Sequence, residues 1–155
     1  MKNRKYIAPL FLLVQLMMMQ TSLLAGGSHY MVFHYKSSDY QVGTQNWGIS
    51  PDASGRFFVA NNSGLLVIEG SDVSVYPLPK GGLIRSVACY DNRVYTGSFE
   101  EFGYWEEKEG RFEYTSLVPL VNSNHFKNDE IWKIVQHNKK LYFQSFGNIF
   151  VYDGK

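Results

Sequence analysis

Residues 84–110, IRSVACYDNRVYTGSFEEFGYWEEKEG, decide the fold that we predict for this chain. An alternating apolar run comes first, Asp91 and Asn92 form a turn signal, and an aromatic run leads to a second turn that contains a glycine. A third run then ends in acidic residues and Gly110. Side chains alternate between the two faces of a strand, so only one face has to be buried. The segment therefore predicts three short strands joined by turns.

The same succession of runs and turns is present in residues 46–70 and in residues 131–154. One aromatic residue holds the same place in the second run of each copy: Phe58, Tyr95 and Tyr142. The third runs are residues 65–68, 102–105 and 149–152. Because plain apolar side chains fill this run in the other copies, core packing explains the aromatic residues of 102–105 better than stacking on a ligand does. An internal repeat of this kind indicates a repeat architecture.

A fourth run closes the first two copies, at residues 73–78 and 111–117. Pro77 and Pro79 would be costly in a central strand but are tolerated in an edge strand. Four antiparallel strands in a unit of roughly 40 residues are typical of a β-propeller blade. The chain is therefore predicted to be all-β, a partial β-propeller of about two and three-quarter four-stranded blades. The limits are 43–80 for the first blade, 81–117 for the second, 118–129 for a loop between blades and 130–155 for an incomplete third blade.

This number of blades is too small for a closed ring, because propellers typically have roughly four to eight blades. An open array would leave an apolar face and strand edges uncovered. We therefore expect the chain to be an N-terminal fragment of a longer protein. Within the N-terminal segment 26–42, residues 30–36 are a candidate strand for closing the missing last blade.

Residues 1–25 have the layout of a secretory signal peptide. Basic residues precede an apolar run at 7–19, and cleavage is expected after Ala25. The run of about 13 residues is too short for a membrane span, which needs about 20. An uncleaved anchor is the alternative, because Leu23 is bulky for its place before the cleavage site. We expect the protein to be exported and periplasmic.

The formal net charge is +1, which argues against an extended surface for binding nucleic acid. Cys89 is the single cysteine, so the chain cannot form an intrachain disulfide. It stands in an alternating run and is expected to pack as a small buried hydrophobe. A catalytic thiol would need a positioned histidine.

Residues 40–70 and 78–106 resemble the two-component-regulator propeller repeats of bacterial periplasmic sensors. The segments GTQNW (43–47) and EFGYWE (101–106) are the more specific parts of the match. The resemblance is closest to triple-tyrosine-motif regulators that end in a LuxR-type helix-turn-helix, a group related to hybrid sensor kinases. It covers about residues 30–155.

In that family, periplasmic propellers precede an immunoglobulin-like triple-tyrosine domain, a transmembrane helix and an output domain, either a helix-turn-helix or a histidine kinase. The resemblance implies non-catalytic reception of a signal, often a carbohydrate-derived ligand. Implied partners are an oligosaccharide, the remaining blades and the triple-tyrosine domain of the longer protein, and dimers are expected only of the full-length protein. No cofactor and no direct contact with nucleic acid are expected of this segment.

Alignment of the copies singles out one position, two residues before an apolar residue of each first strand: Trp47, Arg85 and Trp132. First strands line the central channel of a propeller. Side chains at this position are therefore predicted to converge on a ligand, with indole for stacking and guanidinium for oxyanions. Asn46 and Lys133 are polar neighbours that are predicted to join them. The alternative is that both Trp side chains pack between blades, because they share strand parity with Ile49 and Ile134, which are expected to be buried.

None of the four histidines shows the spacing of a metal motif, so no metal site is predicted. No nucleophile elbow, phosphate loop or carboxylate pair stands out. We therefore expect a ligand-sensing propeller and not an enzyme. The alternatives are a lactonase-like or glycan-cleaving propeller enzyme and a structural surface propeller without a ligand. The enzyme would need metal-binding carboxylates or an acid–base pair at the channel mouth.

Overall fold

The computed structural model describes residues 31–40 and 42–154, and the predicted signal peptide lies outside these ranges. The chain divides into two units, residues 1–34 and residues 35–155. In the first unit only residues 31–34 are described, and they contain no helix or strand. Within the described ranges, no helix is long and apolar enough to cross a membrane.

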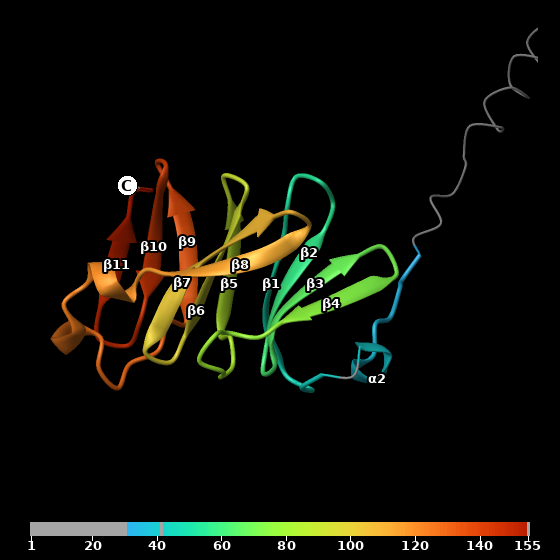
Figure 1. Ribbon diagram of the computed structural model, residues 1–155, viewed down its shortest axis with the longest axis horizontal. Coiled ribbons are helices and arrows are strands. Elements are labelled where there is room, and N and C mark those ends of the chain that lie inside the picture. Colours follow the sequence, from blue (N-terminus) through green and yellow to red (C-terminus); the bar gives the residue numbers. More distant parts are fainter. Residues whose placement is uncertain (1–30, 41, 155) are drawn as a thin grey trace, which may run out of the picture. The chain divides into compact units, whose positions relative to one another are not determined.

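The described strands of the second unit form three antiparallel sheets, so the all-β prediction is confirmed (Figure 1). The first sheet consists of β1 (Asn46–Pro51), β2 (Phe57–Asn61), β3 (Gly64–Glu69) and β4 (Asp72–Tyr76). The second consists of β5 (Ser86–Tyr90), β6 (Arg93–Ser98), β7 (Glu101–Lys108) and β8 (Arg111–Ser116). The third consists of β9 (Lys133–His137), β10 (Lys140–Gln144) and β11 (Ile149–Tyr152). In each sheet, every strand pairs with its neighbour along the chain.

Helical structure in the described ranges is short. It comprises α2 (Ser37–Tyr40) and two 3-10 turns, Val118–Leu120 and Ser123–His125. Both 3-10 turns lie in the segment that the sequence assigns to a loop after the second sheet. The strands therefore supply most of the core, and buried residues of the connecting segments, such as Ile84 and Ile131, complete it.

Two-residue turns set the register of the first hairpin in the second and third sheets. Asp91 and Asn92 connect β5 to β6 with φ of 51° and 58°, and Asn138 and Lys139 connect β9 to β10 with φ of 49° and 60°. Positive φ at both central residues is the geometry of a type I′ turn, whose twist matches that of the flanking strands. Asn and Asp adopt this conformation more readily than most residues.

Two apolar clusters hold the sheets together, one between the first and second sheets and one between the second and third. In the first cluster, Phe58 and Leu65 lie with Trp105 of β7. In the second, Phe102 packs against Phe143 with ring centroids 4.8 Å apart. Phe102 and Trp105 are each 2% exposed, so core packing explains the aromatic residues of β7, as predicted.

The two links between sheets make the same contact. The Ile84 N–H donates to the Asn61 carbonyl at 3.0 Å, and the Ile131 N–H donates to the Ser98 carbonyl at 3.1 Å. Both isoleucines are fully buried. Gly97 in β6 permits the second contact, because a Cβ there would lie 2.4 Å from the Cβ of Ile131. The third sheet is therefore joined to the second in the way that the second is joined to the first.

The outer faces of the first and third sheets are partly open. Strand parity predicts that Ile49 is buried, but it is 64% exposed. Ile49 pairs with Val59 and lies on the face of the first sheet opposite to the second sheet. Val151 lies on the corresponding outer face of the third sheet and is also exposed. The prediction for Ile49 is wrong because alternation shows that residues share a face but not which face is covered.

Two further predictions concern strand ends. β4 lies at the edge of its sheet, as predicted, but it ends at Tyr76, so Pro77 follows the edge strand and does not lie inside it. Residues 31–36 contain no strand. Their role in closing a further blade stays a prediction, because a closing strand needs a sheet with which to pair.

Cys89 lies in β5 and packs against the first apolar cluster, where it is half-buried. Its Sγ donates to the Ser50 carbonyl at 3.7 Å. Burial raises the pKa of the Cys89 thiol, so the thiol keeps its proton at neutral pH. The contacts are those of a packing residue, as predicted, although burial is incomplete.

Candidate functional site

The first strands of the three sheets, β1, β5 and β9, lie side by side (Figure 1). Trp47 lies at the start of β1, and Arg85 and Trp132 directly precede β5 and β9. These three residues, which we name the Trp–Arg–Trp cluster, are therefore positioned at the edge where the first strands begin.

Arg85 stands between the two indoles. Its guanidinium carbon is 3.8 Å from the ring centroid of Trp47 and 4.8 Å from that of Trp132. Both distances fall within the ~6 Å over which an aromatic face attracts a cation. A planar guanidinium also stacks well on aromatic faces. The structure thus brings together the three residues that share one place in the repeat.

A β-bulge shapes the chain at Trp47. The β1–β2 register shifts between Asn46 and Gly48, so Trp47 has no residue opposite it. Bulges of this kind re-aim a side chain at the edge of a sheet. The indole Nε1 of Trp47 donates a hydrogen bond to Asn62 Oδ1 at 2.7 Å, which fixes the ring beside Arg85.

Glu130 holds Arg85 from the side. Arg85 Nε is 2.8 Å from Glu130 Oε1, and the two side chains are 14% and 12% exposed. A charge-assisted hydrogen bond in a largely dry place is stronger than the same pair on the surface. Among the described residues, no acceptor binds the two terminal nitrogens of Arg85. These nitrogens remain as hydrogen-bond donors, while Nε and both guanidinium faces are occupied.

The aromatic side chains at this edge are open to solvent. Trp47 is 41% exposed and Trp132 is 39% exposed, so neither is enclosed between sheets as the alternative interpretation expects. Phe146, also exposed, meets Trp132 edge-on with ring centroids 5.0 Å apart. Phe99 is exposed at the corresponding turn after β6. Exposed aromatic faces beside hydrogen-bond donors form a surface on which a ligand with an apolar face can stack.

Sequence reasoning missed Glu130, Asn62 and Phe146, all of which contact the cluster. Asn62 and Phe146 lie, with Phe99, in the turns between the second and third strands of their sheets. Their shared place in the repeat is visible in the sequence. Their nearness to the first strands depends on the hairpin geometry, which returns each second strand to the edge where its first strand began. For Glu130 we find no sequence signal other than its place directly before buried Ile131.

Two predicted members of the site lie apart from the cluster. Asn46 accepts a hydrogen bond from Asn61 Nδ2 at 2.8 Å and donates one to the Tyr40 hydroxyl at 3.4 Å, so it braces the start of β1. Lys133 alternates with buried Ile134 and therefore faces the outer side of the third sheet. It forms no ion pair with any residue that the structure describes.

Asp129 fixes the turn that carries Phe146. Its carboxylate accepts hydrogen bonds from Ser145 Oγ at 2.5 Å and from the Phe146 N–H at 3.0 Å. Burial by itself would raise the pKa of the Asp129 carboxyl, but the hydrogen bonds outweigh burial and hold this pKa below its ordinary value. An ionised side chain therefore holds the turn in place at neutral pH.

Stacking and hydrogen-bond donation are the chemistry that the cluster offers. In the part of the chain that the structure describes, no three or more His, Cys, Asp or Glu side chains are placed to hold a metal ion. No model of a known protein family matches the chain, and no curated protein matches it either. The resemblance to two-component-regulator propeller repeats therefore rests on the quoted residues alone.

Proposed function

We propose that the chain is the N-terminal part of an exported, periplasmic β-propeller that binds a carbohydrate ligand, without catalysis, for a transmembrane regulator. The repeated junction supports the propeller. If one rotation relates the first sheet to the second and the second to the third, further copies continue around an axis. The first strands β1, β5 and β9 would then surround that axis.

The observation that carries ligand binding is the Trp–Arg–Trp cluster. A sugar ring has an apolar C–H face that can lie on an indole, and its hydroxyl oxygens can accept hydrogen bonds from the terminal nitrogens of Arg85. Glu130 and Asn62 hold Arg85 and Trp47 in place before a ligand arrives. Such preorganisation lowers the conformational entropy that binding would otherwise cost.

The regulatory role rests on the resemblance of residues 40–70 and 78–106 to periplasmic sensor propellers. The predicted signal peptide agrees with a receptor that meets its ligand outside the cytoplasm. In the proposed protein, the segments that cross the membrane and bind DNA or transfer phosphate would follow this chain.

Tryptophan fluorescence tests ligand binding, because two of the three Trp residues of the chain belong to the cluster and Trp105 lies in the core. The complete chain would be titrated with neutral hexasaccharides of glucose, xylose and mannose. We expect a saturable change in emission with at least one of them. The change should persist in the control variant Trp105→Phe, and the affinity should fall about tenfold in Trp132→Ala.

Two outcomes would overturn ligand binding by the cluster: no saturable change with any of the three sugars, or the same affinity in Trp132→Ala as in the parent. Hydrolysis of a hexasaccharide during the titration would instead indicate a propeller enzyme. Chromatography of the sugar after the titration distinguishes this outcome from binding.

A further inference from the structure

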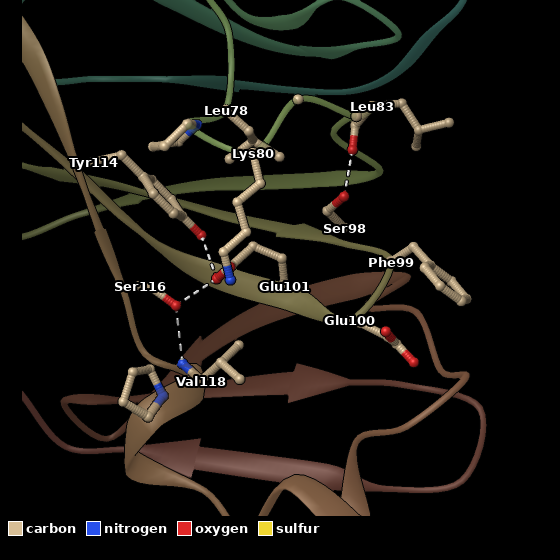
Figure 2. A pocket seen from close by; sticks show the side chains of 14 residues that line it. Leu78, Lys80, Leu83, Ser98, Phe99, Glu100, Glu101, Tyr114, Ser116 and Val118 are labelled. Carbon is tan, nitrogen blue, oxygen red and sulfur yellow. Dashed lines mark hydrogen bonds and ion pairs between the residues drawn. The ribbon is translucent and has the colours of Figure 1, made fainter.

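A concave site apart from the Trp–Arg–Trp cluster lies beside the link between the first and second sheets (Figure 2). Its volume is about 700 Å³, and we name it the linker pocket. Its walls come from residues 78–83 of the link, residues 98–101 at the turn between β6 and β7, Tyr114 and Ser116 of β8, and residues 118–119. A cavity of this size is typical of small-molecule sites.

Most of the wall of the linker pocket is apolar. Aliphatic and aromatic side chains come from three separate segments, namely Leu78, Leu83, Phe99 and Val118. Gly81 and Gly82 have φ of 72° and 100°, a conformation that favours glycine. This part of the link therefore adds no side chain to the pocket, and a ligand with an apolar body can enter beside it.

Two glutamates, Glu100 and Glu101, line the pocket, and the carboxylate of Glu101 carries the argument. Figure 2 shows that the Tyr114 hydroxyl and Ser116 Oγ both donate to Glu101 Oε1, at 3.1 and 2.6 Å. The Glu101 side chain is 14% exposed. Burial, and after it the charge of Glu101, raises the pKa of the Tyr114 hydroxyl, so Tyr114 keeps its proton and remains a donor. Both neutral donors are thus directed at one oxygen of the carboxylate.

The other oxygen, Glu101 Oε2, has a distant partner. Lys80 Nζ lies 3.9 Å from it, and the Lys80 side chain is 88% exposed. An ammonium in direct hydrogen bond with a carboxylate would lie at about 2.8 Å. Lys80 therefore forms a weak ion pair and keeps its charge in water. Glu100, the neighbouring carboxylate, accepts a hydrogen bond from the Asn128 N–H.

We propose that the linker pocket binds an organic ammonium ion with a compact apolar body, which donates to Glu101 Oε2 in place of Lys80. A cation is favoured because the two close donors to this poorly hydrated carboxylate are neutral, and its ion pair with exposed Lys80 is weak. The apolar walls favour a hydrocarbon or aromatic body over a strongly hydrated one. The ion pair with Lys80 shows that an ammonium group can approach this oxygen. The proposal does not depend on carbohydrate binding at the Trp–Arg–Trp cluster.

Isothermal titration calorimetry of the complete chain tests the proposal with three probes of similar shape: 2-phenylethylammonium, neutral 2-phenylethanol and anionic 3-phenylpropionate. We expect heat of binding from the ammonium alone. Lys80→Ala should strengthen its binding about threefold, because a competing ammonium is removed. Glu101→Gln should weaken it about tenfold or more, because a hydrogen bond to a charged group is lost.

The matched control is Glu113→Gln, which changes an exposed glutamate that pairs with Lys108 at 3.1 Å. It should bind the ammonium as the parent does. No binding of the ammonium at millimolar concentration, equal binding of all three probes, or weaker binding in Lys80→Ala would each overturn the proposal, as would parental affinity in Glu101→Gln. If Glu101→Gln does not fold, the probe series and Lys80→Ala decide, since Lys80 is exposed.

Discussion

Arg56 and Arg85 lie near opposite ends of β1, and each stacks on two aromatic rings. The two contacts have different roles. Arg56, in the turn after β1, has its guanidinium carbon 5.5 Å from the ring centroid of Phe58 and 5.4 Å from that of Phe112. Its nitrogens meet Asp52 at 2.9 Å and Glu107 at 2.8 Å. It thus joins the first sheet to the second on the side away from the Trp–Arg–Trp cluster.

The two arginines differ in how far their aromatic partners are exposed to solvent. Phe58 belongs to the first apolar cluster, and Phe112 packs against it. The indoles beside Arg85 are about 40% exposed. A cation between rings that pack in the core joins two sheets, whereas a cation between exposed rings holds a surface in shape. Loss of a ring should therefore reduce stability at the Arg56 end and ligand binding at the Arg85 end.

The largest effect is expected from Phe58→Ala. Phe58 is fully buried, and its removal leaves a cavity between two sheets, which should lower the free energy of unfolding by about 3–5 kcal/mol. The matched control is Phe57→Ala in the same strand, whose side chain is 44% exposed and should cost about 1 kcal/mol or less. Urea unfolding of both variants measures the difference, and equal losses would contradict the assignment of the two faces.

Removal of the arginines themselves should reverse the order of the stability losses, so that Arg85→Ala costs more than Arg56→Ala. Arg85→Ala leaves the Glu130 carboxylate, which is 12% exposed, without its partner, and should cost about 2 kcal/mol. Arg56→Ala leaves Glu107, which is 41% exposed and can be hydrated, and Asp52, which is 18% exposed but keeps its hydrogen bonds from Ser54 and from the backbone N–H of residue 56. This variant should therefore cost about 1 kcal/mol. The same unfolding experiment compares them. A larger loss for Arg56→Ala would show that burial of the carboxylate partner does not determine the loss of stability.

A smaller effect is expected from Asp129→Asn, and it should depend on pH. The folded-state pKa of Asp129 lies below its ordinary value of 3.8. Its contribution to stability is therefore fully present above about pH 5 and is lost as pH falls through the folded pKa. The variant should show a shallower fall of unfolding free energy between about pH 5 and pH 2.

Asp52→Asn, at the residue directly after β1, tests the same effect as Asp129→Asn. Burial alone would raise the pKa of Asp52, but hydrogen bonds from Ser54 and Arg56 lower it, so the variant should act in the same direction. Urea unfolding at a series of pH values measures both variants. A curve for Asp129→Asn that is parallel to that of the parent would contradict the hydrogen-bonded, ionised state of Asp129.

The smallest effect on stability is expected from Trp47→Ala. Its indole is 41% exposed, so less apolar area returns to water than at a core position, and the loss should be about 1 kcal/mol or less. Urea unfolding monitored by circular dichroism avoids dependence on the removed fluorophore. A loss as large as that of Phe58→Ala would show that Trp47 is part of the core and not of a binding surface.

Much of the fold could be predicted because its signals are local. Alternation of apolar residues and the Asp91-Asn92 turn define strands within a few residues. Comparison of the copies predicted that Phe102 is buried. Neither the local patterns nor the comparison of the copies could show that Ile49 is exposed. Its exposure depends on whether another sheet covers that face, which only the arrangement of the sheets shows.

The candidate site could be predicted in position but not in structure. The repeat alignment found Trp47, Arg85 and Trp132, since they share one place before the first strands. The bulge at Trp47 and the ion pair of Arg85 with Glu130 follow from how successive sheets meet, and this requires coordinates. For Lys133 the prediction used nearness in sequence, although alternation places neighbouring side chains on opposite faces.

Gly97 has a consequence beyond the sheet that contains it. A Cβ at this position would lie 2.4 Å from the Cβ of Ile131 and 2.6 Å from Ser86 Oγ, so Ile131 or β5 would have to shift. Trp132 follows Ile131 directly, so a shift of Ile131 would also change the position of the Trp132 indole relative to the Arg85 guanidinium. The separation of Trp47 and Trp132 therefore depends on the absence of a Cβ at Gly97, although β6 contains neither tryptophan. Loss of a ligand could therefore result from a mutation in the protein interior that touches no part of the binding surface.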